Sequence, residues 1–477
     1  MCDVVPTTMK RAWVRVMSLD AARALRTLQS LQSRSNDSDG SAAHEAFEVL
    51  DAAISAASDD RRALHEFALS APINGGARRS SAVASVLCRL AHWQRGDLER
   101  FHASRRPSSD GDDPSVTALD RALDAAVELQ QLRLAVATKL ARESIELAGR
   151  ARRLCPTHRF GEVLLAQMLY EQGELEQAEA LLRDHFQAMR TGACADVAIG
   201  LYTVLARIAI DQSKGDLAML LLRDGIAIGE ARGWQRLIAA CSQELIELFI
   251  CTGRIAQARE CLRALQERCS DTASHDAGLA GALVHMQCRV HVAGGEAAEA
   301  IPELARLQLL AKERGDIYAC ARVQIRLAEA LDACGRTADA LDTLADTLEL
   351  GCRAGLHQSF VSAGPAVNDL LLRFVRTSSS EPHRYGSLQP YASSLLRHGR
   401  LGDPPSCARA IKLRGPLSGR EHAILRLMRH GSSNKLIARQ LGIAPETVKS
   451  HAKRIFVKLG AQTRVEAVTK AANLSLI

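Results

Sequence analysis

Residues 417–455 read LSGREHAILRLMRHGSSNKLIARQLGIAPETVKSHAKRI, and this stretch decides the fold of the C-terminal part of the chain. Ser418 and Glu421 have the S-x-x-E spacing of a capping box, in which two side chains satisfy the first free N–H groups of a helix. The apolar residues that follow are spaced for one buried face, and they are Ile424, Leu425, Leu427 and Met428. The sequence therefore predicts a first helix that stops before Gly431.

Two more helices are predicted after this glycine. Ser433 is placed to cap a second helix over 434–441, and Gly442 then supplies a tight turn. Pro445 suits the first position of a third helix, because its missing N–H would have no partner there. Short helices separated by a tight turn are typical of a helix-turn-helix, whose last helix enters the major groove of DNA.

The third predicted helix has an apolar face and a polar face. The apolar positions recur at i, i+4, i+7 and i+11, and they are Val448, Ala452, Ile455 and Leu459. Exposed residues early in such a helix reach base edges, while flanking cations hold phosphates. We therefore predict base contacts from Lys449, Ser450 and Lys453. His451 lies beside the apolar face and is interpreted as a packing residue.

Phosphate contacts are expected from the hydroxyl, amide and cationic side chains around this face, namely Ser433, Asn434, Lys435, Thr447, Arg454, Lys458 and Arg464. Charge supports this prediction. Residues 409–477 hold fourteen Lys and Arg against three acids, whereas the whole chain is only +7, so the part before residue 409 is net negative. Such an asymmetry indicates that one part of the chain meets double-stranded DNA.

The body of the chain repeats at about forty residues. One series of glycines has spacings of 42, 38, 42 and 40 residues and consists of Gly173, Gly215, Gly253, Gly295 and Gly335. A second series lies between them and consists of Gly192, Gly233, Gly315 and Gly355. Two turns per repeat, with helical apolar spacing between them, predict stacked helix pairs that share one core, which is an α-solenoid.

The expected fold class is all-α, since aromatic residues are only 4% of a chain rich in Ala, Leu and Arg. We expect the helical-repeat solenoid over residues 1–375, with the repeats clearest over 150–360. Residues 376–412 are rich in Pro, Gly and Ser and are predicted to form a linker with one short helix over 391–398. The DNA-binding domain is expected over 413–477.

Composition excludes several other classes of protein. The thirteen cysteines contain no Cys-x-x-Cys pair, so neither a zinc site nor a disulfide framework is expected. The longest stretch without charge is too short and too polar to span a bilayer, so we expect a cytoplasmic protein without membrane contact. No pattern of carboxylates, serines or histidines indicates catalysis. The prediction is therefore a non-enzyme without catalytic residues, cofactor or metal.

Residues 417–474 resemble the DNA-binding domain of the LuxR/NarL (GerE-type) family, a four-helix unit. The positions that match the family's spacing are Arg420, Glu421, Gly431, Ser433, Asn434, Lys435, Ile437, Ala438, Thr447, Val448, Lys449, His451, Lys458, Leu459, Arg464, Ala467 and Val468. The resemblance implies a dimeric bacterial transcription factor that reads two half-sites, with a last helix over about 463–474 at the dimer contact. Ala444 and Leu436 depart from the family's usual residues, which weakens two helix starts without removing a DNA contact.

Residues 150–360 resemble the tetratricopeptide-like repeat region of the MalT group of bacterial regulators, as in LLRDGIAIGEARGW over 221–234. The resemblance implies that this region senses an unknown small-molecule or protein effector, and that the protein regulates transcription, with contact to RNA polymerase possible. MalT-type regulators also carry an amino-terminal ATPase. This chain departs from them, because it has no Gly-Lys pair and therefore no P-loop for a nucleotide.

Three readings of the function remain open at this point. The first is a transcriptional regulator that reads DNA through its helix-turn-helix. The second is a protein-interaction scaffold in which the helix-turn-helix is vestigial. The third is the C-terminal part of a MalT-like, ATP-dependent regulator. The cations Lys449 and Lys453 favour the first over the second, because a vestigial domain has no reason to keep them on its outward face.

Overall fold

The structure is a computed structural model that describes residues 40–70, 81–107, 113–150, 159–184, 186, 194–273, 276–380, 382–401, 419–429, 434–459 and 467. Over these residues it contains helices and turns but no strand, so the prediction of an all-α fold is confirmed. The chain divides into two compact units, residues 1–405 and 406–477, which are described separately.

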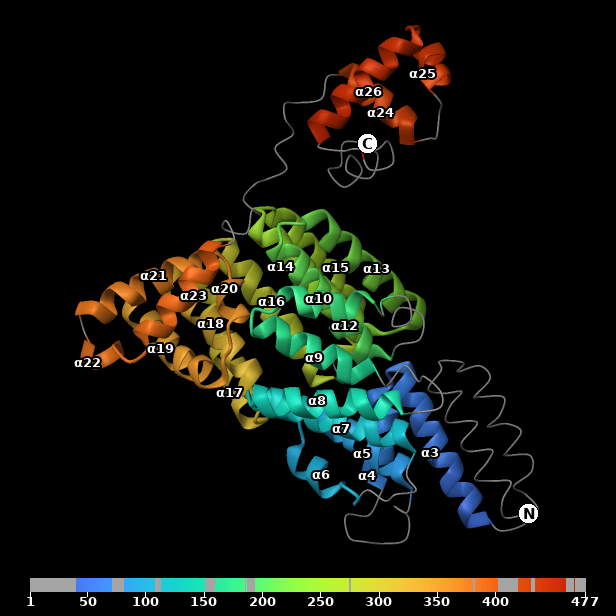
Figure 1. Cartoon of the computed structure of the whole chain (residues 1–477), viewed down its shortest axis with the longest axis vertical. Helices are drawn as coiled ribbons and strands as arrows, with labels where there is room; N and C mark the ends of the chain where they lie inside the picture. Colours follow the sequence, from blue (N-terminus) through green and yellow to red (C-terminus); the bar gives the residue numbers. More distant parts are fainter. Residues whose placement is uncertain are drawn as a thin grey trace. The chain divides into compact units, whose positions relative to one another are not determined.

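The first unit is built from helices that pack against their neighbours in the chain (Figure 1). They are α3 (Gly40–Ser58), α4 (Arg61–Ser70), α5 (Ala82–Arg95), α6 (Leu98–Ala103), α7 (Pro114–Gln130), α8 (Leu134–Gly149), α9 (Arg159–Glu171), α10 (Leu175–Arg183), α12 (Ala195–Asp211), α13 (Gly215–Arg232), α14 (Gln235–Cys251), α15 (Ile255–Ala273), α16 (Ala277–Ala293), α17 (Ala297–Glu313), α18 (Ile317–Ala333), α19 (Thr337–Ala354), α20 (Gln358–Val361), α21 (Pro365–Ser380), α22 (Pro382–Tyr385) and α23 (Gln389–Leu401).

Left-handed residues end the helices at the predicted period. Gly173, Gly253, Gly295 and Gly335 have φ between 72° and 87°, a conformation that costs glycine nothing because it has no Cβ. Gly215 does not have this role. It is the first residue of α13, and Ser213, with φ 60°, takes the left-handed position two residues earlier. Gly192 lies outside the described residues.

Some helices bury one apolar stripe, as the spacing predicts, whereas others, such as α12, are buried on nearly every side. On α15, for example, Ala258, Leu262 and Leu265 are buried and Cys261 is partly buried against the same core. The largest fully buried side chain is that of Trp234, at the start of α14. Because a lone helix pair could not cover these stripes, the shared core is what makes the repeats stack.

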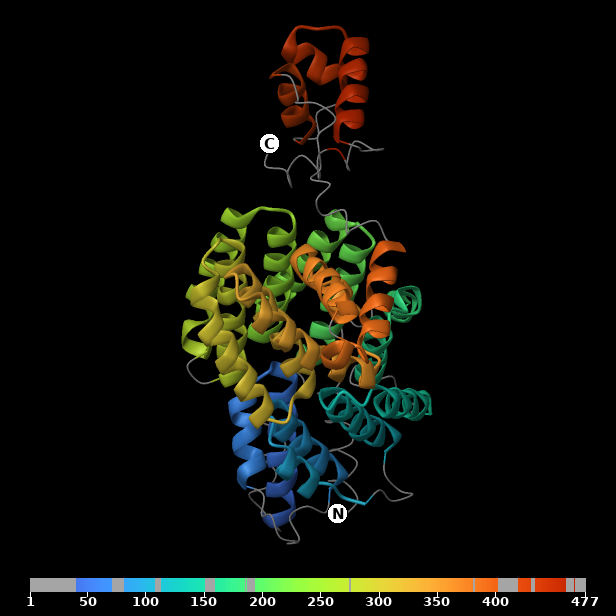
Figure 2. The same cartoon turned by 90° about the vertical axis from the view of Figure 1, so that its left-hand side faces the viewer.

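The first unit folds back so that helices distant in sequence meet. The Gln131 side chain after α7 donates to the carbonyl of Gly315, just before α18, with Nε2–O 2.7 Å. The His357 backbone N–H donates to the Glu171 carbonyl at the end of α9, with N–O 2.8 Å. The two perpendicular views of Figures 1 and 2 show the helices that these contacts join. The helices brought together in this way surround the cavity described below.

The sequence predicts the stretch 376–412 as a linker with one short helix over 391–398. That helix lies within the longer α23, and α22 is an additional helix in the same stretch. α23 packs against α19, α20 and α21, and Tyr391 on α23 donates its hydroxyl hydrogen to the Leu356 carbonyl. Tyr385 in α22 donates to the Asp342 carboxylate on α19. α22 and α23 are therefore packed parts of the first unit.

Gly200 in α12 marks a close approach of two helices. A Cβ added there would lie 2.0 Å from Cγ1 of Val163, which is buried on α9. We expect Gly200→Ala to lower the free energy of unfolding by about 1–3 kcal/mol, because helix α12 must move away from α9. Chemical denaturation of both proteins measures the difference.

Gly215→Ala is the matched control for this substitution. Nothing lies within 4 Å of the Cβ position at Gly215, which is also helical. We expect this change to be neutral or to stabilise by up to about 1 kcal/mol, because alanine lowers the entropy of the unfolded chain. Equal effects of the two substitutions would contradict the tight packing at Gly200.

Candidate DNA interface and repeat-region cavity

The second unit contains three described helices, α24 (Gly419–Arg429), α25 (Asn434–Leu441) and α26 (Pro445–Leu459). These bounds confirm the predicted second helix and the predicted start of the third at Pro445. Gly442 has φ 64°, and the next N–H, of Ile443, donates to the Ala438 carbonyl at 3.0 Å. The tight turn between α25 and α26 therefore has the geometry that the glycine predicts.

The three helices enclose one small core. Its buried members are Ile424, Leu425, Met428, Ile437, Ala438, Val448, Ala452, Ile455 and Ala467. This confirms the predicted apolar face of α26 for the residues described, while the side chain of Leu459 and the capping residue Ser418 lie outside them. Burying this face fixes which way the opposite face of α26 points.

The predicted base-reading residues lie on that opposite face. Lys449, Ser450 and Lys453 are all exposed. The Lys449 Nζ lies 2.8 Å from Oε1 of Glu446, and the Ser450 hydroxyl donates to the Glu446 carbonyl at 3.1 Å. An exposed ion pair of this kind contributes only about 0–1 kcal/mol. Lys449 is therefore able to leave Glu446 and contact DNA instead.

The predicted phosphate contacts are described only in part. Thr447 and Arg454 are exposed on α26, and Asn434 is half-buried at the start of α25. Lys435 and Lys458 lie on α25 and α26, but their side chains are outside the described residues. Ser433, Arg464 and the last helix expected over 463–474 are outside them altogether, except Ala467.

His451 and Leu436 also have described positions. His451 is half-buried on α26, and its Nδ1 is buried without a hydrogen-bond partner among the described residues. Leu436 is 45% exposed on α25. An exposed leucine at this position leaves the first turn of α25 without an acid, as the departure from the family pattern implies.

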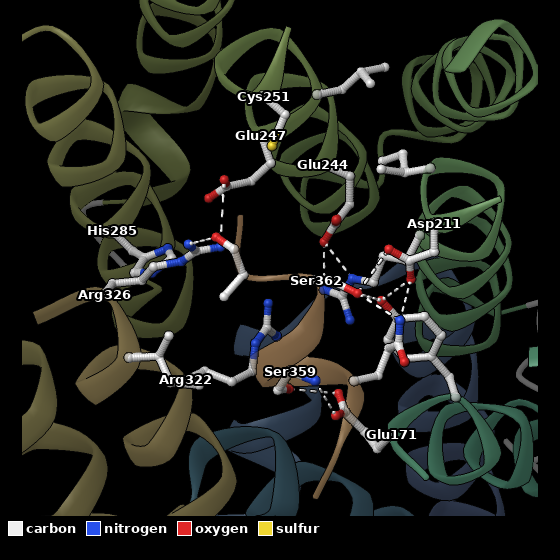
Figure 3. Close-up of a pocket in the computed structure, with 17 residues that line it drawn as sticks. Glu171, Asp211, Glu244, Glu247, Cys251, His285, Arg322, Arg326, Ser359 and Ser362 are labelled. Atoms are coloured by element: carbon white, nitrogen blue, oxygen red, sulfur yellow. Dashed lines mark hydrogen bonds and ion pairs between the residues drawn. The ribbon is translucent and has the colours of Figure 1, made fainter. Parts of the chain in front are cut away.

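The first unit contains a cavity of about 90 Å³ that sequence reasoning missed. Its walls come from α9, α12, α14, α16, α18 and the segment around α20 (Figure 3). Polar and charged side chains dominate the view, including Glu171, Asp211, Glu244 and Glu247. This volume is several times what one ordered water requires, so a small molecule of a few atoms fits.

Two of the carboxylates are held by neutral donors. Glu171 accepts hydrogen bonds from the Tyr318 hydroxyl at 2.5 Å and from the Ser359 hydroxyl at 2.9 Å. Asp211 accepts from the Ser362 hydroxyl at 2.8 Å and, at 2.9 Å each, from the side chains of Tyr170 and Gln358. Burial raises the pKa of Asp211 to about 6, and these hydrogen bonds oppose the rise.

The other two carboxylates are held by arginines. Glu244 accepts from Nε of Arg207 at 3.0 Å, and Glu247 accepts from Nε of Arg289 at 2.7 Å. Burial opposes ionisation of Glu247, yet Arg289 and Arg326 outweigh it and hold the pKa of Glu247 well below its usual range. Burial lowers the pKa of His285 to about 3, so this imidazole is neutral at pH 7.

A signal for the cavity was present in the sequence. Charged residues recur at helical spacing within otherwise apolar helices, as Arg207 and Asp211 on α12, Glu244 and Glu247 on α14, and Arg322 and Arg326 on α18. Such pairs point to one face of each helix. The helices belong to different repeats, so the pattern by itself does not show that those faces meet.

One further group of side chains has metal-ligand character in the described part of the chain. His291, Glu296 and Glu299 place their ligand atoms within 4.8 Å of one another. Both carboxylates are exposed, as acidic surface groups commonly are without an ion. In the same described part, no helix is long and apolar enough to cross a membrane.

The fold and the C-terminal interface together define a helical-repeat protein with a helix-turn-helix DNA-binding domain. A family model described as the MalT-like TPR region matches residues 77–377, and the chain belongs to this family. A second model, described as bacterial regulatory proteins of the luxR family, matches residues 415–471. These matches confirm both resemblances, and the repeat match begins well before residue 150. They support DNA binding and transcription regulation, and proteins of these two families are typically non-enzymatic.

A solved structure shares the fold of the repeat region. The chain resembles the crystal structure of Rap protein complexed with competence and sporulation factor, with a TM-score of 0.58 and 11% identity. The similarity covers 74% of this chain and 99% of that one. At this identity the likeness concerns the fold alone.

Proposed function

We propose that the protein is a DNA-binding transcriptional regulator whose helix-turn-helix reads the major groove and whose helical-repeat region senses a ligand or a protein partner. The observation that carries the proposal is the arrangement of α26. Val448, Ala452 and Ile455 are buried, whereas Lys449 and Lys453 are exposed on the other side of the same helix. This arrangement, in a domain matched by the luxR family, suits a recognition helix.

The proposal gives each predicted contact residue a role. Lys449, Ser450 and Lys453 contact base edges, because they lie on the exposed face of α26. Phosphate contacts come from Ser433, Asn434, Lys435, Thr447, Arg454, Lys458 and Arg464. The protein acts as a homodimer, since two copies reading two half-sites double the contacts, and RNA polymerase is the further partner through which it changes transcription.

The sensing role of the first unit is supported by its fold and by its cavity. Rap protein, which shares the fold, is complexed with a factor in its crystal structure. In this chain the repeats enclose a cavity lined by polar and charged side chains, in addition to their apolar core. In small-molecule sites a few precisely placed polar groups fix the orientation of the ligand, and this cavity offers such groups.

Fluorescence anisotropy with the full chain and DNA from the promoter region of its own gene tests the DNA-binding part. We expect tighter binding to this DNA than to a scrambled duplex, with affinity that falls steeply as salt rises. Lys449→Ala/Lys453→Ala is expected to weaken specific binding at least about tenfold and to remove the preference.

Arg336→Ala/Arg353→Ala is the matched control, because it also removes two exposed cations but from α19 and the turn before it. It should leave DNA affinity unchanged. If no promoter region or genomic fragment binds better than scrambled DNA, the protein is better explained as an interaction scaffold. Equal losses in the two double variants would point to a general charge effect instead of a recognition helix.

A further inference from the structure

The cavity contains one arginine, Arg322, that makes no hydrogen bond within the described part of the chain. Three arginines line it, Arg207, Arg322 and Arg326. Arg207 is paired with Glu244, and Arg326 lies 3.1 Å from Glu329 and donates to the Ala363 carbonyl at 2.6 Å. Among the residues that the structure describes, Arg322 makes no hydrogen bond or ion pair, and Figure 3 shows its guanidinium pointing into the cavity.

The environment of Arg322 selects for an anionic partner. Its neighbour on α18, Tyr318, offers only a ring, with the guanidinium carbon 5.9 Å from the ring centre. The carboxylates of the wall accept hydrogen bonds from other donors, and the described contacts include none from Arg322. A half-buried guanidinium whose planar set of donors has no partner among the described residues matches a carboxylate in two parallel hydrogen bonds.

The volume of the cavity and the charges on its wall limit the class of ligand that fits. A cavity of about 90 Å³ suits a small organic acid, not a polymer that would need a groove. Because four carboxylates line the same wall, a dianion such as phosphate meets more repulsion than a monocarboxylate does. The neutral imidazole of His285 also lines the cavity and offers one donor and one acceptor to the rest of the ligand.

We propose that this cavity is a binding site for a small organic acid, whose carboxylate is held by Arg322 and whose remaining polar groups face His285. The proposal rests on the proposed function, because it names the class of ligand that the repeat region senses. The segment 358–363 closes the site, since Ser359 and Ser362 tie it to Glu171 and Asp211. A ligand on Arg322 therefore lies against a segment that leads directly into α21.

Thermal unfolding of the full chain in sodium propionate, sodium phosphate and sodium chloride at equal ionic strength tests this site. Propionate is expected to raise the midpoint by about 2 °C or more over chloride, because a ligand that binds only the folded state stabilises it. Phosphate should raise it less. Arg322→Gln should lose the propionate effect, and Arg322→Lys should keep part of it because it retains the charge.

Arg306→Gln is the control, since Arg306 is exposed on α17 and pairs with Glu303 on the same helix. It should keep the whole propionate effect, and circular dichroism checks that every variant is folded. No rise in the wild type, or an equal rise in Arg322→Gln, would overturn the site. DNA binding is measured on the same samples. A propionate effect without DNA binding would refute the proposed regulator and leave the acid site standing. DNA binding without a propionate effect would refute the acid site alone.

Discussion

Replacing Arg289 with alanine is expected to lower the free energy of unfolding by about 3 kcal/mol, because it leaves two carboxylates without their main partner in a buried setting. The Arg289 side chain is 4% exposed on α16. Its Nε lies 2.7 Å from Glu247 on α14, and its Nη1 lies 2.7 Å from Glu329 on α18. Urea unfolding followed by circular dichroism measures the change.

The position of Arg289 in the repeat explains the size of this effect. Glu247 precedes it by 42 residues and Glu329 follows it by 40, so one guanidinium joins three successive repeats. Losing one partner of a buried pair costs about 3–5 kcal/mol. We expect the lower end, because Arg326 also approaches Glu329, at 3.1 Å, and Glu247, at 3.7 Å, and stays in place.

Arg306→Ala is the matched control for this prediction. Arg306 also pairs with a glutamate, Glu303, but its side chain is 55% exposed and both residues lie on α17. Water screens this pair, so its loss should change stability by no more than about 0.5 kcal/mol. A loss for Arg289→Ala as small as that for Arg306→Ala would show that the three repeats are held together by their apolar core alone.

Local sequence signals predicted the features whose causes are local. Pro445 at the first position of α26 and Gly442 in the turn before it act through their own backbone, so the bounds of α25 and the start of α26 followed from them. The glycine period predicted the helix pairs for the same reason. Even Gly215, which is not left-handed, marks a repeat, because the left-handed residue Ser213 lies only two positions before it.

Prolines explain why the sequence predicts only one short helix, over 391–398, in the stretch 376–412, whereas the structure has α22 and a longer α23 there. We interpreted Pro382 and Pro390 as breakers typical of a linker. In the structure Pro382 is the first residue of α22, and Pro390 is the second residue of α23. Proline is well tolerated in the first turn of a helix, so the same residue that ends one pattern begins another. Only the packing of α23 on α19 to α21 distinguishes the two cases.

The cavity could not be predicted because its cause is not local. Ser359 reaches Glu171 across 188 residues, and Gln358 reaches Asp211 across 147. Whether these side chains meet depends on the small rotation between successive repeats, added up over the whole array. A single sequence gives the spacing of the repeats but not that rotation. The sequence therefore shows the charged pairs on α12, α14 and α18, but it does not show that they line the same cavity.

Asp211 leads to the second large prediction, which concerns pH. Asp211→Asn is expected to gain stability relative to the wild type by roughly 2.5 kcal/mol as pH rises from about 4 to about 7. Burial raises the pKa of Asp211 from 3.8 to about 6. The folded wild type therefore holds this proton more tightly than the unfolded chain does. Its contribution to stability is complete below about pH 4 and is lost as pH rises through about 6.

The asparagine variant lacks this loss, because its amide does not ionise. Its carbonyl oxygen still accepts hydrogen bonds, and the hydroxyls of Tyr170 and Ser362 are able to turn and accept from its NH₂ group. Urea unfolding of both proteins at each pH gives the difference, in which every other titrating group cancels. Asp346→Asn, at an exposed site on α19, should follow the wild type throughout. Parallel stability curves for Asp211→Asn and the wild type would mean that Asp211 stays ionised in the folded protein, with Arg207 and the three donors outweighing its burial.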